Sequence, residues 1–132
     1  IDYGYKNIYY IIDKNSNHVN RIPEKYKKNI VYKYTFKHYL YFFAAKTFIG
    51  TEMPGHLMEL RSSSKIIARR LYSNKFKYVF LQHGVMYMVS LDSARRGFFR
   101  KGKSIPDYTK IVVSSEEEAN HFIELGGYER KV

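Results

Sequence analysis

Five short runs of apolar residues restrict the folds open to this 132-residue chain. In the runs 8–12 and 78–81, apolar residues fall on both alternating faces, which is typical of a parallel strand that is covered on both sides. Residues 30–34, 48–50 and 111–113 form the other three runs, and mostly helical connections separate the five. This order predicts an α/β fold, a Rossmann-like parallel sheet with flanking helices.

Three helical segments are expected. Residues 36–46 favour a helix, and residues 57–71 contain either one broken helix or two short ones. A third helix should open at Glu116–Glu118, because acidic side chains interact favourably with the positive end of the helix dipole. It should run to Leu125, with Ser114 and Ser115 as caps before it and a glycine pair after it.

The length and the chain ends predict one domain within a longer protein. A chain of 132 residues fits a single domain, and it starts with Ile1 without the pattern of a signal peptide. No run of 18 apolar residues occurs, so we expect no membrane-spanning helix. We therefore expect residues 1–132 to be one segment of a larger protein.

The residues that are absent exclude several kinds of chemistry. The chain has no cysteine, which excludes disulfides, thiolate metal sites and a cysteine nucleophile. It contains no HExxH motif, no GxGxxG motif and no GxxxxGK[ST] motif, so neither a metal site nor a nucleotide-binding loop is predicted in this segment. We expect no cofactor.

The charge predicts an anionic partner. Lys and Arg number 23 against 12 Asp and Glu, which gives a formal net charge of +11. Nucleic acid, an acidic lipid surface and a phosphate-bearing substrate all fit this charge. Two basic clusters stand out, and each is either a solvated face or a contact for a polyanion or for lipid headgroups: Lys65, Arg69 and Arg70; and Arg95, Arg96, Arg100, Lys101 and Lys103.

The end of the fourth apolar run carries the strongest candidate for chemistry. Gln82, His83 and Gly84 follow it directly, and ligands of open parallel sheets bind beyond the carboxyl ends of the strands. An imidazole can accept a proton from a hydroxyl near neutral pH, and the glycine lets a substrate approach the backbone. His83 is therefore either a general base or a hydrogen-bonded turn histidine. His56 follows Pro54 and Gly55 after the third run, and it is either a weaker candidate for substrate binding or a solvated surface histidine.

Four stretches of the sequence carry a resemblance to a known family. They read NIYYIID from Asn7, RIPEKYKKNIVYKYTFKHYLYFFAAKTFIGTE from Arg21, YVFLQHG from Tyr78 and IVVSSEEEANHFIELGGYERKV from Ile111. Together they resemble the CDP-glycerol glycerophosphotransferases, which build teichoic acids and related capsular polymers. The resemblance implies a two-domain glycosyltransferase B architecture, in which this segment is the acceptor-side N-terminal domain and the nucleotide-binding domain lies beyond Val132.

The same resemblance implies a reaction. A terminal hydroxyl of a lipid-linked polymer would attack the phosphorus next to glycerol in CDP-glycerol, or in a related CDP-polyol, and release CMP. His83 matches the histidine of the family's HG motif and would take the hydroxyl proton. The enzyme would be cytoplasmic and peripheral on the inner face of the cell membrane, and this segment alone would be inactive.

A non-catalytic function is the alternative. Basic residues interleaved with 14 Tyr and 9 Phe also suit a nucleic-acid-binding module, and a binding module for anionic membranes is a further possibility. Many of the aromatic residues fall in runs that predict a core, which argues against a specific nucleic-acid partner.

Overall fold

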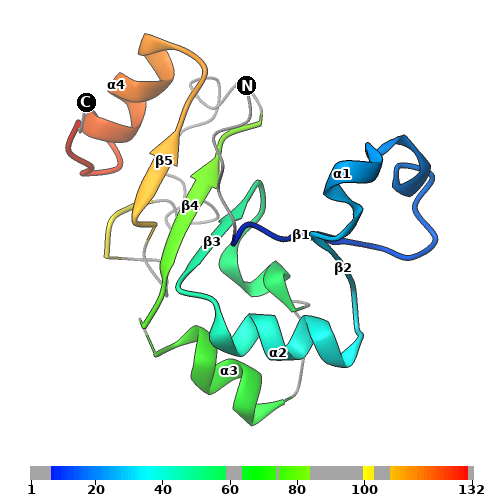
Figure 1. The fold of residues 1–132 in the computed structure, drawn as a ribbon. Coiled ribbons are helices and arrows are strands. Elements are labelled where there is room, and N and C mark those ends of the chain that lie inside the picture. The colour runs from blue at the N-terminus through cyan, green and yellow to red at the C-terminus, as the bar shows by residue number, and fades with distance from the viewer. Residues whose placement is uncertain (1–6, 59–63, 74, 84–99, 103–107, 131–132) are drawn as a thin grey trace. The chain divides into compact units, whose positions relative to one another are not determined.

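The computed structural model describes residues 7–58, 64–73, 75–83, 100–102 and 108–130 (Figure 1). The chain forms two compact units, Ile1–Ala45 and Lys46–Val132, and each is described by itself. No helix in the described ranges is long and apolar enough to cross a membrane.

The first unit is built on two parallel strands. Strand β1 pairs with β2 in the register Tyr10↔Ile30 and Ile12↔Tyr32. Helix α2 packs against β2, where Ile30 and Val31 are buried. The elements, in chain order, are β1 (Tyr10–Ile12), the 3-10 helix η1 (Val19–Arg21), α1 (Glu24–Lys27), β2 (Ile30–Tyr32) and α2 (Phe36–Ala44).

The expected burial of the first strand on both faces is wrong. Tyr10 is 56% exposed, and Ile8 and Ile11 are also exposed. Just before β1, the ring of Tyr9 stacks on the ring of Tyr41 of α2, with the two centroids 4.4 Å apart, and this pair covers the start of the strand in part. Apolar residues on both faces of a strand favour burial of both faces, but burial also requires neighbouring layers that cover them. In this unit β2 is the strand that is buried.

A buried histidine holds the turn between β2 and α2. His38 is 1% exposed, and its Nδ1 accepts a hydrogen bond of 3.1 Å from the Tyr34 N–H. Tyr34 has a φ of 62°, a left-handed conformation that costs a non-glycine residue about 1–2 kcal/mol. Thr35 caps the helix by accepting from the His38 N–H at 3.3 Å. The neutral imidazole is thus part of the turn.

This arrangement predicts a loss of stability in acid. Burial, with the positive charge of Lys33, lowers the pKa of His38 from its usual value near 6.5. The unfolded chain therefore binds the proton more readily, so the stabilisation is complete above about pH 6.5 and is lost as the pH falls through the folded pKa. Chemical denaturation between pH 7.5 and pH 5 should show this slope, and His38→Gln should reduce it. An equal slope in both proteins would contradict this assignment.

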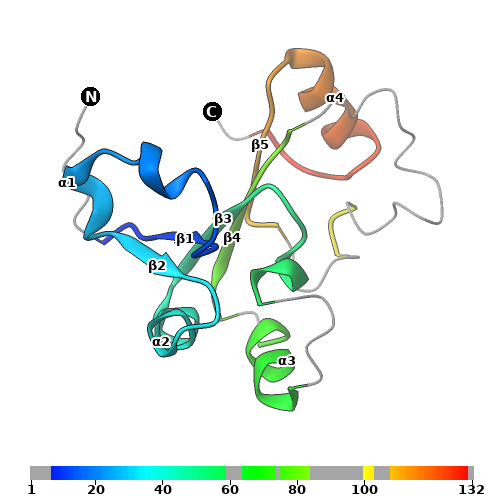
Figure 2. The same cartoon turned by 90° about the vertical axis from the view of Figure 1, so that its right-hand side faces the viewer.

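The second unit holds a sheet of three parallel strands in the order β3-β4-β5. Figures 1 and 2 show α4 beside β5, and Phe122 of α4 packs against Ile111 and Val113. The elements are β3 (Thr47–Gly50), the 3-10 helix η2 (Pro54–Leu57), α3 (Lys65–Leu71), β4 (Lys77–Leu81), β5 (Lys110–Val112) and α4 (Glu116–Glu124).

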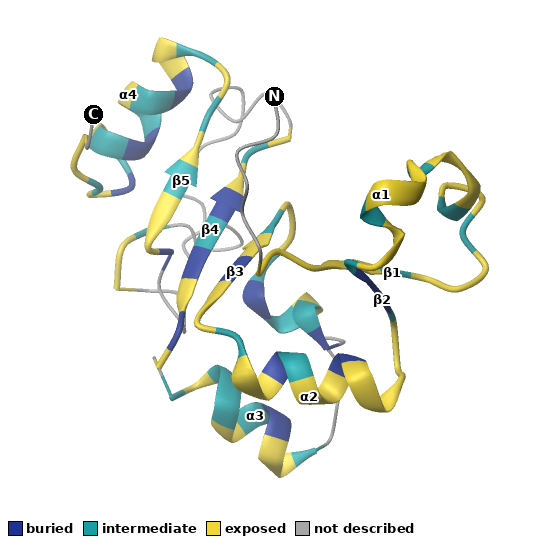
Figure 3. Cartoon of the chain, viewed as in Figure 1, coloured by how far each residue is buried: buried dark blue, intermediate teal, exposed yellow. Residues whose placement is uncertain are grey.

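The core of this unit is aromatic and centres on β4 (Figure 3). Tyr78 and Phe80 point to its buried face, and the ring centroid of Phe80 lies 5.2 Å from that of Tyr108. Leu81 is exposed, so the expectation that the run 78–81 is buried on both faces is wrong at its last residue, and Val112 of β5 is 50% exposed. The predicted α/β class with parallel strands and flanking helices is confirmed.

Candidate functional site

The carboxyl ends of the three parallel strands bring polar residues to one edge of the sheet. The registers Gly50↔Phe80 and Leu81↔Val112 align these ends. Glu52 follows β3, His83 follows β4, and Ser114 follows β5. This edge is where parallel sheets bind ligands.

An imidazole and a carboxylate face each other at this edge. His83 Nε2 lies 4.0 Å from Glu52 Oε1, and both side chains are exposed, His83 by 59%. The Gln82 N–H donates to the Val112 carbonyl oxygen at 2.8 Å, which extends the ladder between β4 and β5 up to the residue before His83. The histidine therefore leaves the sheet at a fixed point, open to solvent and beside a negative charge. A carboxylate at this distance makes no hydrogen bond to the ring, but its charge can stabilise the imidazolium that forms when the imidazole accepts a proton.

The loop that carries Glu52 is tied to the core. The Tyr78 hydroxyl donates a hydrogen bond of 2.6 Å to the Glu52 carbonyl oxygen. Burial raises the pKa of Tyr78, and so do the neighbouring Tyr108 and Glu52, so the hydroxyl stays protonated and remains a donor. This bond joins β4, which carries the histidine, to the loop that carries the carboxylate.

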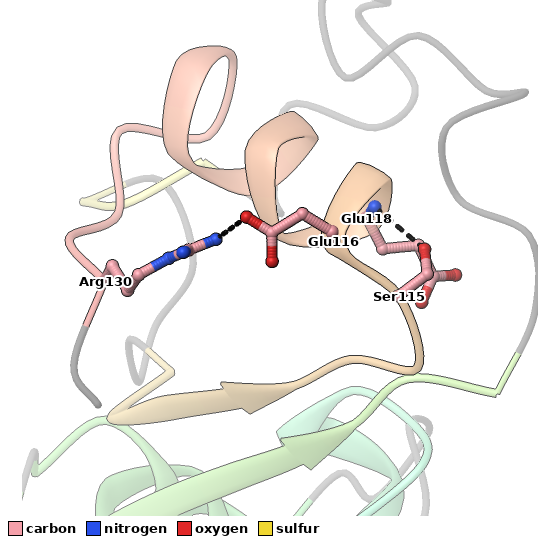
Figure 4. A network of polar contacts seen from close by, with 4 residues as sticks. All are labelled: Ser115, Glu116, Glu118 and Arg130. Carbon is pink, nitrogen blue, oxygen red and sulfur yellow. Dashed lines mark hydrogen bonds and ion pairs between the residues drawn. The ribbon is translucent and has the colours of Figure 1, made fainter.

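The third strand end forms a helix cap, as the sequence predicts (Figure 4). Ser115 Oγ accepts from the Glu118 N–H at 3.2 Å, and the Ser114 N–H and hydroxyl each donate to Glu118 Oε2 at 2.9 Å. Glu118 is 2% exposed, and Arg130 pairs with Glu116 at the first turn of α4. The junction therefore uses its own donors and carries negative charge, which does not favour a phosphate.

The other predicted site residues lie in different surroundings. His56 is exposed in η2. Among the described residues, the charged side chain that lies beside His83 is that of Glu52. Gly84, Arg95, Arg96 and Lys103 lie outside the described residues.

The two basic clusters are engaged to different degrees. In α3, Lys65 and Arg69 are exposed, whereas the Arg70 guanidinium lies 5.1 Å from the ring centroid of Phe76. Lys101 Nζ lies 3.4 Å from a Glu129 oxygen, and Arg100 is half-buried. Lys65 and Arg69 are therefore exposed cations on one short helix, whereas the exposed Lys101 lies beside Glu129.

Glu52 is the site residue that the sequence reasoning missed. It is the first acidic residue after β3, and the argument from strand ends that selects His83 also applies to it. Its pairing with His83 depends on β3 and β4 being neighbours, which no local pattern reveals. In the described ranges, no three His, Asp or Glu side chains gather as a metal site would require.

We compared the chain with family models, curated proteins and solved structures, and nothing in these three comparisons matches it.

Proposed function

We propose that this chain is the acceptor-side part of a transferase that acts on a CDP-activated polyol. The enzyme would move glycerol phosphate, or a related polyol phosphate, to a lipid-linked polymer and release CMP. The observation that supports this proposal is the exposed His83 beside Glu52, 4.0 Å apart at the carboxyl edge of a parallel sheet. The sequence stretches that resemble glycerophosphotransferases include both residues.

The mechanism assigns a role to each side chain. The acceptor hydroxyl oxygen forms a bond to the phosphorus next to the polyol, and the bond from that phosphorus to the CMP oxygen breaks. His83 takes the hydroxyl proton, and Glu52 stabilises the resulting imidazolium. Because phosphoryl transfer depends mainly on positioning and on charge stabilisation, cations must contact the pyrophosphate. We propose that most of these cations belong to a nucleotide-binding domain outside residues 1–132, as in a two-domain glycosyltransferase B architecture.

The proposal is tested by CMP release in the full-length protein that contains this segment. Purified protein should release CMP from CDP-glycerol only when a polyol-phosphate acceptor is added, and the acceptor should gain one phosphodiester for each CMP. Release that does not depend on an acceptor would indicate hydrolysis. Failure of every CDP-polyol to react would contradict the proposed function.

A lipid-linked acceptor also calls for contact with an anionic membrane, on the cytoplasmic face. Helix α3 supports this part of the proposal, because Lys65 and Arg69 are exposed and Ile66 between them is an exposed apolar residue. The nucleic-acid alternative is less well supported. Buried rings such as Phe48 and Phe80 cannot stack on bases.

Membrane contact predicts binding that depends on salt and on α3. The 132-residue chain should co-sediment with phosphatidylglycerol vesicles at low salt, less at high salt, and little with phosphatidylcholine vesicles. Each basic residue near such a surface contributes about 1 kcal/mol, so K65E/R69E should weaken binding about tenfold or more. The control, R21E/K28E, changes the net charge equally outside α3. Equal losses in both variants, or tighter binding to an oligonucleotide, would contradict the contact through α3.

A further inference from the structure

The carboxylate of Glu52 is exposed, and its position opposite His83 therefore requires support from elsewhere. The residue lies two positions beyond the end of β3, where the ladder between β3 and β4 no longer holds the backbone. A loop backbone is more mobile than a strand, and an exposed side chain samples its rotamers from the point at which the backbone places it. The contacts of the Glu52 backbone therefore decide whether the carboxylate starts within reach of the imidazole.

Tyr78 provides that support from within the core. Its Cα is paired with that of Phe48 in the register of the sheet, and the side chain reaches forward from there to the Glu52 carbonyl oxygen at 2.6 Å. Tyr78 is among the most completely buried side chains of the described residues. A ring that is packed so tightly presents its hydroxyl at a fixed point.

Gly50 leaves the space that this hydroxyl occupies. A Cβ added at Gly50 would lie 2.5 Å from Tyr78 Oη, which is too close for any real contact, and 3.5 Å from Tyr78 Cζ, which is ordinary packing. A side chain at position 50 would therefore clash with the hydroxyl, so the Tyr78 ring or the strand would have to shift, whereas a ring without the hydroxyl would meet it at an ordinary distance.

We infer that Tyr78 is a positioning residue, whose hydroxyl holds the loop after β3 so that the Glu52 carboxylate faces His83, and that Gly50 is required for this bond. The inference rests on the proposed function, in which His83 needs a carboxylate beside it. The central strand β4 then has two roles. Its residue Tyr78 holds the loop that carries the Glu52 carboxylate, and His83, the base, follows its carboxyl end.

The inference is tested first without any activity. In the 132-residue chain, NMR should show nuclear Overhauser contacts between the Glu52 side chain and the His83 ring. Tyr78→Phe keeps the ring and removes the donor, and it should reduce these contacts at least about twofold, because the loop loses a buried hydrogen bond. Tyr108→Phe is the matched control: it removes a hydroxyl from the neighbouring ring of the same core and should leave the contacts unchanged.

Gly50→Ala gives an independent variant that keeps every core side chain. It should reduce the same contacts, and in the double variant G50A/Y78F the alanine should add little to the effect of the phenylalanine, because only the tolerated 3.5 Å approach remains. Additive losses would overturn the role given to Gly50. Unchanged contacts in a folded Gly50→Ala protein would overturn it as well, and unchanged contacts in a folded Tyr78→Phe protein would overturn the role given to Tyr78.

The full-length protein then separates this inference from the proposed function. Loss of one hydrogen bond typically corresponds to a change of about threefold to tenfold, so Tyr78→Phe should lower kcat for CMP release by that factor and leave the donor KM unchanged. Lost contacts together with a lower kcat support both claims. Lost contacts with unchanged kcat would support the positioning role and contradict the proposed use of Glu52 in catalysis.

Discussion

Replacement of His83 by alanine should reduce CMP release by the full-length protein at least about a hundredfold, since general base catalysis contributes about a hundredfold to ten-thousandfold. The thermal midpoint and the donor affinity should barely change, because the side chain is 59% exposed and belongs to no core cluster of the described residues. Steady-state kinetics, a thermal melt and a donor titration of the same preparation check this expectation.

His56→Ala is the control for this experiment. His56 is also an exposed histidine after a parallel strand, in the 3-10 helix η2, so the substitution removes the same chemical group. Its effect on kcat should be small. If the His83 variant retains normal turnover, or loses activity only because it unfolds, His83 is a structural turn residue.

Replacement of Phe80 by alanine should be the most destabilising of the changes considered for the second unit. Phe80 lies in the central strand β4, is buried, and contacts Tyr108. Truncation of a buried Phe to Ala typically costs about 3–5 kcal/mol, a large part of the stability of a small domain. Urea denaturation of the 132-residue chain, followed by far-UV circular dichroism, should show a lower midpoint.

Phe36→Ala is the same chemical change at an exposed position. Phe36 is 84% exposed at the start of α2, and exposed substitutions usually alter stability by less than about 0.5 kcal/mol. A cost for Phe36 equal to that for Phe80 would show that α2 buries this face in solution. A negligible cost for Phe80 would contradict the core described for β4.

The sequence allowed the fold class and the local elements to be predicted, because these depend on neighbouring residues. The acidic residues at 116–118 and the glycine pair predicted the two ends of α4. In the structure, Ser115 caps its first turn, and Gly127 adopts a φ of 73° after its last turn. The position of His83 after a strand followed from the same kind of reasoning.

Burial and partners could not be predicted in this way, because they depend on which layers cover a strand and which strands are neighbours. Tyr10 and Val112 lie in apolar runs and are nevertheless exposed. Glu52 lies near His83 because β3 and β4 are neighbours in the order β3-β4-β5, and the sequence does not reveal which strands are neighbours.

Chemical rescue of the His83→Ala protein tests the central claim most directly, because it asks whether a proton acceptor is what the protein has lost. Since the native imidazole is exposed to solvent, a small base can reach the vacated position. Added imidazole should restore CMP release in proportion to the concentration of its unprotonated form, and it should not stimulate the wild-type protein. A folded His83→Ala protein that binds the donor and yet gains no activity from imidazole would contradict the assignment of His83 as the general base.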